Sequence, residues 1–209
     1  MRLLSIKILS QLGAQRGFRW PPATCAIISL NLVAWLTVAW VFNLSPFTRQ
    51  HSTLLLRAGA LNLQLLGEGE WWRILSSQFL HVNFPHLLFN MLALLLLGGM
   101  LESDLGSRRL LALYFVSGSI GHLIGVAATP ALVSSGASQA VMALAGAVAS
   151  GLLSWHKKQT ARLAVLVVLT GVQFGLDMLA AGHIKAGHWG GFLAGALMGY
   201  LLYRRKATG

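Results

Sequence analysis

The sequence predicts an all-α polytopic membrane protein with six transmembrane helices. Of its 209 residues, 56% are hydrophobic and only 10% are charged, whereas soluble domains carry about 25% charged residues. The mean hydropathy is +0.67, and the apolar residues gather into runs of about 17–25 residues, the length that crosses a bilayer. This composition argues against a soluble enzyme, which needs more charge on its surface, and against a disordered chain.

The N-terminal segment 1–23 is predicted to be basic and cytoplasmic. Arg2, Lys7, Arg16 and Arg19 interrupt it, so it lacks the unbroken apolar core of a cleavable signal peptide. Its first residues, MRLLSIKIL, have the pattern of a short basic amphipathic segment that lies on the membrane surface.

Six apolar runs follow within one membrane domain, 24–203. They lack the alternation of barrel strands, so helices are the expected spanning elements. Asp177 is the only formally charged residue in these runs. The predicted spans are 24–43, 84–101, 110–129, 137–155, 163–181 and 187–203.

The first connection, about 44–83, is long and rich in Trp, Leu and Gly. We expect this loop to be external and to lie against the membrane, with Trp71 and Trp72 in the interfacial belt. Trp72, Arg73 and the more distant Glu102 are expected to brace loops and not to catalyse.

The basic residues predict the orientation. With both termini in the cytoplasm, the inner segments, including the tail 204–209, hold twelve of the sixteen Lys and Arg residues, and the outer loops hold four. Positive residues favour the cytoplasmic side. We expect this multi-pass protein to lie in the cell membrane. The bias also explains the net charge of +11 by contact with an anionic lipid leaflet, without a nucleic acid partner.

In this topology, the second, fourth and sixth spans all run from outside to inside. Their first turns carry His86, Ser138 and His188, and Asn90 shares a helix face with His86 because the two are four residues apart. At 1.5 Å per residue, these four polar residues fall at one depth in the outer part of the bilayer.

A serine beside a neutral imidazole is a nucleophile with a general base. The negative charge that develops on an attacked carbonyl needs donors, and His86, Asn90 and the Ser138 backbone N–H are candidates. The positive ends of three helix dipoles add to them. This scheme needs no carboxylate, so Ser138 and His188 are predicted to form a dyad.

The sixth span carries a stripe of small residues that predicts close helix packing. Gly187, Gly191, Gly195 and Gly199 recur every four residues, and such stripes let two helix backbones approach closely. The fourth span offers matching small residues: Ala143, Ala147 and Gly151. Their contact would bring His188 within reach of Ser138.

Asp177 and the other histidines have alternative interpretations. Asp177 is expected to be a capped or water-exposed carboxylate near the fifth loop, and a triad acid is the less favoured alternative. Under the dyad hypothesis, Asp177→Asn retains substantial activity. His81 and His122 join His86 and His188 in the outer half, which makes a metal site conceivable. However, neither HExxH nor paired membrane aspartates occur, so we expect no metal and no cofactor.

The ordered motifs resemble those of the rhomboid intramembrane serine proteases over about residues 70–203. The matching positions are Trp72-Arg73, His81, His86 and Asn90 in FLHVNFPHLLFN, Gly98, Gly99 and Glu102 in GGMLESDLGS, Gly136-Ala137-Ser138, and His188, Gly191 and Gly195 in GHWGGFLAG. The resemblance implies a minimal six-helix rhomboid-like fold. It also implies Ser138 as nucleophile, His188 as base, and His86 with Asn90 as oxyanion stabilisers.

Three positions depart from the family pattern. Gln139 follows the serine where Gly is common, Met142 stands where an aromatic residue often supports the imidazole, and Gly187 replaces the Ala that commonly precedes the histidine. Both Ser138 and His188 remain, whereas inactive members typically lack one of them.

The sequence therefore predicts an intramembrane serine endopeptidase that cleaves transmembrane protein substrates near the outer membrane face. The resemblance suggests the fifth span and loop 182–187 as the substrate gate. One alternative is a non-catalytic rhomboid-like protein that binds membrane helices. A small transporter is a further alternative, but internal repeats and broken helices typical of transporters are not visible. The oligomeric state stays open.

Overall fold

The structure, a computed structural model, describes residues 21–154, 159–182 and 185–207. The predicted amphipathic N-terminal segment lies outside these residues. Within the described ranges the chain is almost entirely helical, and no strands are present beyond one isolated antiparallel bridge between Leu61 and Ser134. The all-α prediction is confirmed.

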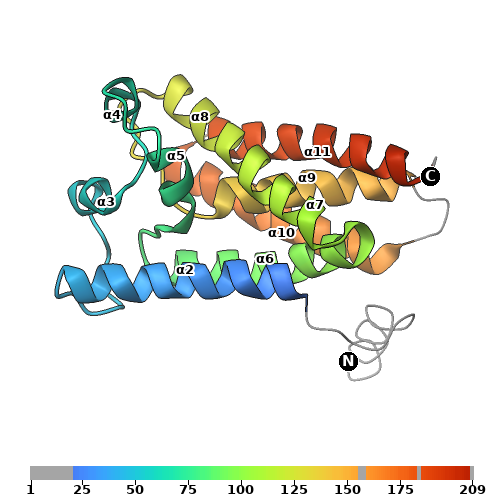
Figure 1. Cartoon of the computed structure of the whole chain (residues 1–209), viewed down its shortest axis with the longest axis horizontal. Helices are drawn as coiled ribbons and strands as arrows, with labels where there is room; N and C mark the ends of the chain where they lie inside the picture. The colour runs from blue at the N-terminus through green and yellow to red at the C-terminus, as the bar shows by residue number, and fades with distance from the viewer. Residues whose placement is uncertain (1–20, 155–158, 183–184, 208–209) are drawn as a thin grey trace.

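In the part of the chain that the structure describes, six long helical units correspond one to one with the predicted spans (Figure 1). They are α2 (Pro22–Val41), α6 (Phe84–Leu105), the continuous unit α7 (Ser107–Ala112), η2 (Leu113–Ser117) and α8 (Gly118–Ala128), α9 (Ser138–Ser154), α10 (Thr160–Ala181) and α11 (Ala186–Ala207). Four of these units in the described ranges are long and apolar enough to cross a membrane: α2, α6, Ser107–Ala128 and Thr160–Leu179. At 17 residues, α9 is shorter, and α11 is rich in glycine and continues into a basic end.

The observed helix bounds differ from the predicted ones by up to four residues, and the third and last units differ in ways that have a physical reason. The third unit contains one π-helical turn, η2, which a 3.6-residue hydrophobic period does not reveal. The last helix extends to Ala207 and includes most of the predicted tail, because Lys and Arg are good helix formers and suit a helix C-terminus.

The loop between α2 and α6 forms a cap at one end of the bundle, opposite the end where α2 begins and α11 ends (Figure 1). It contains α3 (Ser52–Ala58), α4 (Leu63–Gly67), α5 (Arg73–Ser76) and η1 (Ser77–Phe79). Arg73 is buried and donates to the carbonyls of Leu56 and Ala60 and to Glu70. Gly59 has a φ of +108° and leaves room for the Trp72 ring. Trp72 and Arg73 therefore brace the loop, as predicted.

Glu102 fastens α6 to the start of α2. Its carboxylate accepts hydrogen bonds from the Ala23 N–H at 2.8 Å, the Thr24 N–H at 2.9 Å and the Ser107 hydroxyl at 2.6 Å. Pro21 provides no side-chain cap for α2, so Glu102 satisfies donors that the helix start leaves open. The predicted bracing role is confirmed.

The contact between α9 and α11 lies at the centre of the core, and the glycine stripe makes it possible. A Cβ added at Gly191, Gly195 or Gly199 would overlap the backbone of Gln139, Ala143 or Ala147, respectively. The predicted match of small residues is confirmed for Ala143 and Ala147. Gly151 instead faces the ring of Tyr203, further along α11.

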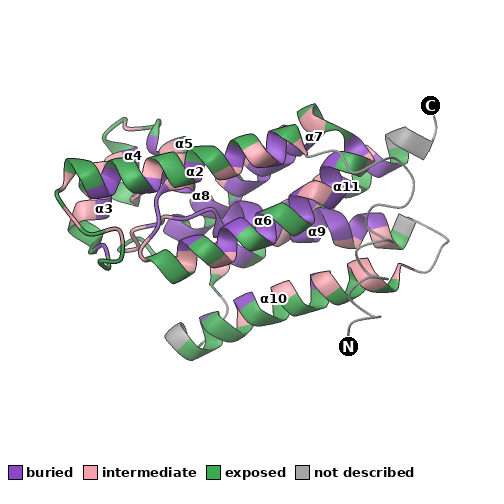
Figure 2. Ribbon diagram, turned by 90° about the horizontal axis from the view of Figure 1, so that it is seen from below, coloured by how far each residue is buried: buried purple, intermediate pink, exposed green. Residues whose placement is uncertain are grey.

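Helix α10 lies along the edge of the bundle, and most of its surface is exposed (Figure 2). Only 11% of its most apolar stretch, within Thr160–Leu179, is buried. Polar contacts attach it near both ends. At one end Arg162 pairs with Asp104 of α6, which also accepts a hydrogen bond from the Tyr203 hydroxyl of α11. At the other end Asp177 contacts the first turn of α11.

Candidate active site

Ser138 is the first residue of α9, and the loop before it fixes its position. The Gly136 N–H donates to the Ser77 carbonyl at 2.9 Å. Gly136 has a φ of +113°, and a Cβ there would lie 2.7 Å from the His86 ring. Conformation and space therefore both require glycine at this position. Ser138 itself is only 2% exposed.

His188 lies in the first turn of α11, directly beside Ser138. Its Nε2 is 2.9 Å from the Ser138 Oγ, and the residue is 4% exposed. The two helices carry these side chains within hydrogen-bonding distance because the glycine stripe lets their backbones touch. The proximity predicted from the sequence is present in the structure.

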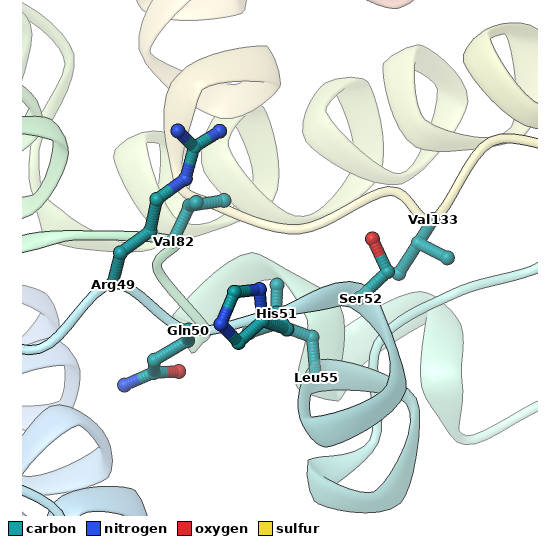
Figure 3. A pocket seen from close by; sticks show the side chains of 7 residues that line it. All are labelled: Arg49, Gln50, His51, Ser52, Leu55, Val82 and Val133. Atoms are coloured by element: carbon teal, nitrogen blue, oxygen red, sulfur yellow. The ribbon is translucent and has the colours of Figure 1, made fainter.

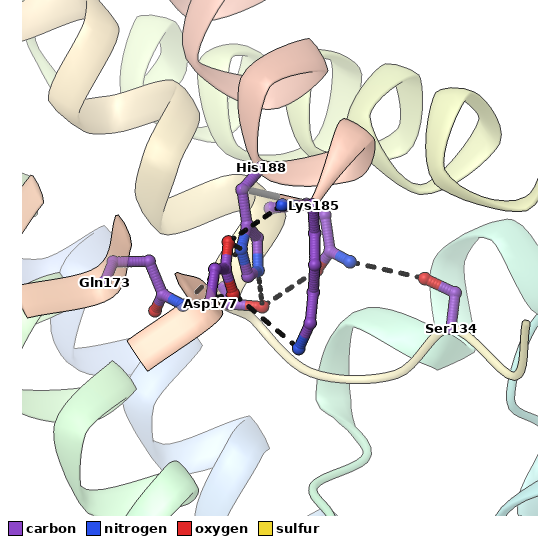
Figure 4. Close-up of polar contacts among 7 residues, drawn as sticks. Ser134, Gln173, Asp177, Lys185 and His188 are labelled. Atoms are coloured by element: carbon purple, nitrogen blue, oxygen red, sulfur yellow. Dashed lines mark hydrogen bonds and ion pairs between the residues drawn. The ribbon is translucent and has the colours of Figure 1, made fainter. Parts of the chain in front are cut away.

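The sequence predicted Asp177 to be a capped or water-exposed carboxylate, and the structure shows that it is not exposed to water. It is 1% exposed, and its Oδ2 is 2.6 Å from the His188 Nδ1 (Figure 4). The left-handed Gly182, with a φ of +70°, ends α10 and reverses the chain direction. This turn places the start of α11 against the last turns of α10, an arrangement that hydropathy does not indicate.

Two further side chains complete the surroundings of Asp177. The Lys185 N–H donates to Oδ2 at 3.1 Å, and the Lys185 Nζ is 3.6 Å from Oδ1. The Gln173 Nε2 lies 3.4 Å from Oδ1 and one turn away on α10. The sequence analysis did not predict that Lys185 or Gln173 would contact Asp177. The available signal was the four-residue spacing of Gln173 and Asp177, which puts two polar groups on one face of an apolar helix.

The structure places His86 against the serine loop (residues 134–137) and Asn90 one turn further along α6. The His86 ring packs against Gly136, two residues before Ser138. Asn90 is fully buried, and its Nδ2 donates to the His86 carbonyl at 3.0 Å. Its Oδ1 has no partner among the described residues. The described contacts include no hydrogen bond from either side chain to Ser138, so their oxyanion role stays a prediction.

A second polar network, formed by Gln139, Ser134 and His122, supports the loop that precedes Ser138. The Ser138 hydroxyl also lies 3.0 Å from the Gln139 Oε1, and the Gln139 Nε2 donates to the Ser134 Oγ at 3.2 Å. His122 contacts the Ser134 Oγ at 2.8 Å and the Gly136 carbonyl at 3.1 Å. These bonds hold residues 134–136 in the shape that presents Ser138. Neither the role of Gln139 nor that of His122 was predicted.

His81, in the loop before α6, supports the same segment. Burial lowers its pKa to about 3, so the ring is neutral at physiological pH. Its Nε2 accepts from the Ala137 N–H at 3.4 Å, and its Nδ1 then donates to the Phe79 carbonyl. Across the described ranges, no group of three or more His, Cys, Asp or Glu side chains is arranged to hold a metal ion.

Comparison with known proteins gives the family of the chain. The model of the rhomboid domain matches residues 68–205, which is more than half of the chain. The chain belongs to the rhomboid family. The protein YdcA of Bacillus subtilis (strain 168) is 32% identical over 203 residues, 92% of this chain and 94% of its own length.

Other relatives are longer than this rhomboid. Rhomboid protease GluP of Bacillus subtilis (strain 168) is 35% identical over 147 residues, 68% of this chain and 29% of GluP. RHOMBOID-like protein 5 of Arabidopsis thaliana is 36% identical over 158 residues, 73% of this chain and 51% of the relative. The chain thus spans about half the length of the plant relatives that it matches.

This rhomboid also has an open pocket of about 410 Å³ beside the loop between α2 and α6 (Figure 3). Its lining is Arg49, Gln50, His51, Ser52, Leu55, Val82 and Val133. Neither Ser138 nor His188 lines it, so the pocket is separate from the candidate active site.

Proposed function

We propose that this rhomboid is an intramembrane serine endopeptidase in which Ser138 is the nucleophile and His188 is the general base. The observation that carries the proposal is the 2.9 Å contact between the Ser138 Oγ and the His188 Nε2. Two side chains 50 residues apart meet there, and both are almost fully buried. Packing alone does not require a hydroxyl and an imidazole at this point, because glycine and alanine make the closest α9–α11 backbone contacts further along the two helices.

The chemistry follows from the positions of the atoms. His188 Nε2 accepts the Ser138 proton as Oγ attacks the substrate carbonyl. The oxyanion is stabilised by the Ser138 N–H at the start of α9, together with the His86 ring and the second N–H of Asn90. His188 then returns the proton to the leaving amine, and water hydrolyses the acyl-enzyme with His188 again acting as base.

The substrates of this proposed protease are transmembrane proteins. A helix hides its carbonyls in hydrogen bonds, and unwinding it in lipid leaves polar groups unsatisfied. We therefore infer that the cut lies near the membrane surface and that substrates carry helix-weakening Gly or Pro there. The twelve-to-four distribution of basic residues supports cytoplasmic termini in the cell membrane, which puts the Ser138 end of the bundle on the outer side.

Labelling with a fluorophosphonate tests the proposal. The full chain, purified in detergent, is compared with Ser138→Ala and His188→Ala, and each is also reconstituted with a transmembrane substrate. Labelling and cleavage that both require Ser138 and His188 support the enzyme. A folded wild-type protein that neither labels nor cleaves would instead be a rhomboid-like binder of membrane helices.

A further inference from the structure

The contact between Asp177 and His188 is the polar feature that the proposed dyad does not use. Asp177 is one of only five acidic residues in the chain. It is 1% exposed, and its Oδ2 lies 2.6 Å from the His188 Nδ1, on the opposite side of the ring from Ser138. A carboxylate is costly to bury unless its hydrogen bonds are satisfied, so this placement requires a reason.

We propose that Asp177 is a positioning residue for His188, which makes the site a Ser138–His188–Asp177 triad. The inference rests on the proposed protease function and adds to it. In such a triad the carboxylate fixes the tautomer and orientation of the imidazole and stabilises the imidazolium that forms, without taking the proton itself.

The hydrogen bonds specify which imidazole nitrogen carries the proton. A carboxylate only accepts, so the 2.6 Å contact places the proton on Nδ1, which donates to Asp177. The lone pair of Nε2 then faces the Ser138 hydroxyl at 2.9 Å, as a general base requires. The Gln173 Nε2 also lies 3.4 Å from the His188 Nδ1. Both atoms are donors in this tautomer, so the Gln173 amide donates to the Asp177 Oδ1 instead.

The surroundings also keep Asp177 in place as a charged acceptor. The Lys185 backbone N–H shares Oδ2 with the imidazole, and the Lys185 ammonium compensates the charge at 3.6 Å from Oδ1. When Ser138 transfers its proton to Nε2, the imidazole becomes positive directly beside this carboxylate. The proton later leaves with the amine product, and Asp177 stays ionised throughout.

A structural role is the competing explanation. The same contacts attach the edge helix α10 to α11, so removing them would loosen the bundle whatever the chemistry. The chain provides a matched control at the other end of α10. There Asp104 pairs with Arg162 and accepts from Tyr203, remote from His188. Asp104→Asn weakens an attachment of α10 without changing a contact of the imidazole.

The experiment compares Asp177→Asn, Asp177→Glu and Asp104→Asn, reconstituted with one transmembrane substrate. We expect Asp177→Asn to lower kcat by up to about 10⁴-fold with KM within about 2-fold. Asp177→Glu should recover part of the loss, because Glu serves in the same position of other triads. Asp104→Asn should lower the melting temperature as much as Asp177→Asn while kcat stays within about 3-fold of wild type.

A spectroscopic measurement keeps the test decisive if kcat is too low to measure. In ¹⁵N-histidine-labelled protein, the hydrogen-bonded Nδ1 proton of His188 should give a resonance that is lost in Asp177→Asn and His188→Ala and retained in Asp104→Asn. The triad is refuted if Asp177→Asn keeps wild-type kcat while Ser138→Ala is inactive, and the protease function then still stands. It is also refuted if kcat falls equally in Asp177→Asn and Asp104→Asn. If wild type and Ser138→Ala are equally inactive, the protease function itself fails.

Discussion

A single methyl group at Gly191 should separate Ser138 on α9 from His188 on α11, the two residues of the proposed active site. The Cβ of Gly191→Ala would overlap the carbonyl oxygen of Gln139, the residue after Ser138, and would lie 3.1 Å from its carbonyl carbon. Backbone atoms of α9 cannot rotate away, so α11 must move by about 1 Å to restore an ordinary contact. The Ser138–His188 distance of 2.9 Å would then exceed the reach of a hydrogen bond.

The expected cost is about 10²-fold in kcat, the usual effect of misplacing a catalytic group by about 1 Å. Overpacking should also lower stability by about 1–3 kcal/mol. Gly190→Ala is the matched control, because the three atoms nearest to its Cβ all belong to the Ile124 side chain of α8 and none to the backbone of α9. Turnover and thermal unfolding in the same detergent check both effects. Wild-type kcat in Gly191→Ala would show that the α9–α11 contact does not set the distance between Ser138 and His188.

Four further outcomes are expected. Ser138→Ala and His188→Ala should each abolish cleavage, and the double variant should be no worse in kcat, because groups that act as a unit are non-additive. Asn90→Ala should lower kcat by up to about 10²–10³-fold; a raised KM with normal kcat would place Asn90 in substrate binding. Glu102→Gln should lower the free energy of unfolding by about 1–3 kcal/mol, measured by denaturation, because buried donors of α2 lose a charged acceptor. Reporter fusions should place Gly209 in the cytoplasm and loop 44–83 outside; an external C-terminus would overturn the shared orientation of the three helices.

The sequence was sufficient for the parts of the fold that depend on local composition. Hydrophobic length located the six helical units, because only long apolar helices satisfy their backbone groups in lipid. The four-residue glycine period identified the tight interface of α11, because small residues on one face of a helix allow close approach. The pairing of Ser138 with His188 then followed from two helix starts at one depth.

The remaining features depend on loops whose path no periodicity encodes. The partner of Asp177 is set by the turn at Gly182 and by the position of Lys185, so a lone carboxylate in an apolar span gave no indication of His188. The bonds of Gln139 and His122 likewise depend on how residues 134–136 cross the end of the bundle. For this reason the sequence favoured a dyad, whereas the structure places the Asp177 carboxylate beside His188.

In the proposed mechanism, the location of Asp177 on α10 links the chemistry to substrate entry. Ser138 and His188 are only 2% and 4% exposed, so a substrate backbone reaches them only after part of the bundle moves. Helix α10 is the least buried of the four candidate spans in the described ranges, and helices in lipid gain no hydrophobic energy from packing on each other. Its polar contacts at the two ends therefore contribute much of what holds it in place. Outward movement of its Asp177 end would break the bond that orients His188. A rhomboid that admits substrate beside α10 would therefore regain its oriented base only when α10 returns, and cleavage would follow closure of the helix, not its opening.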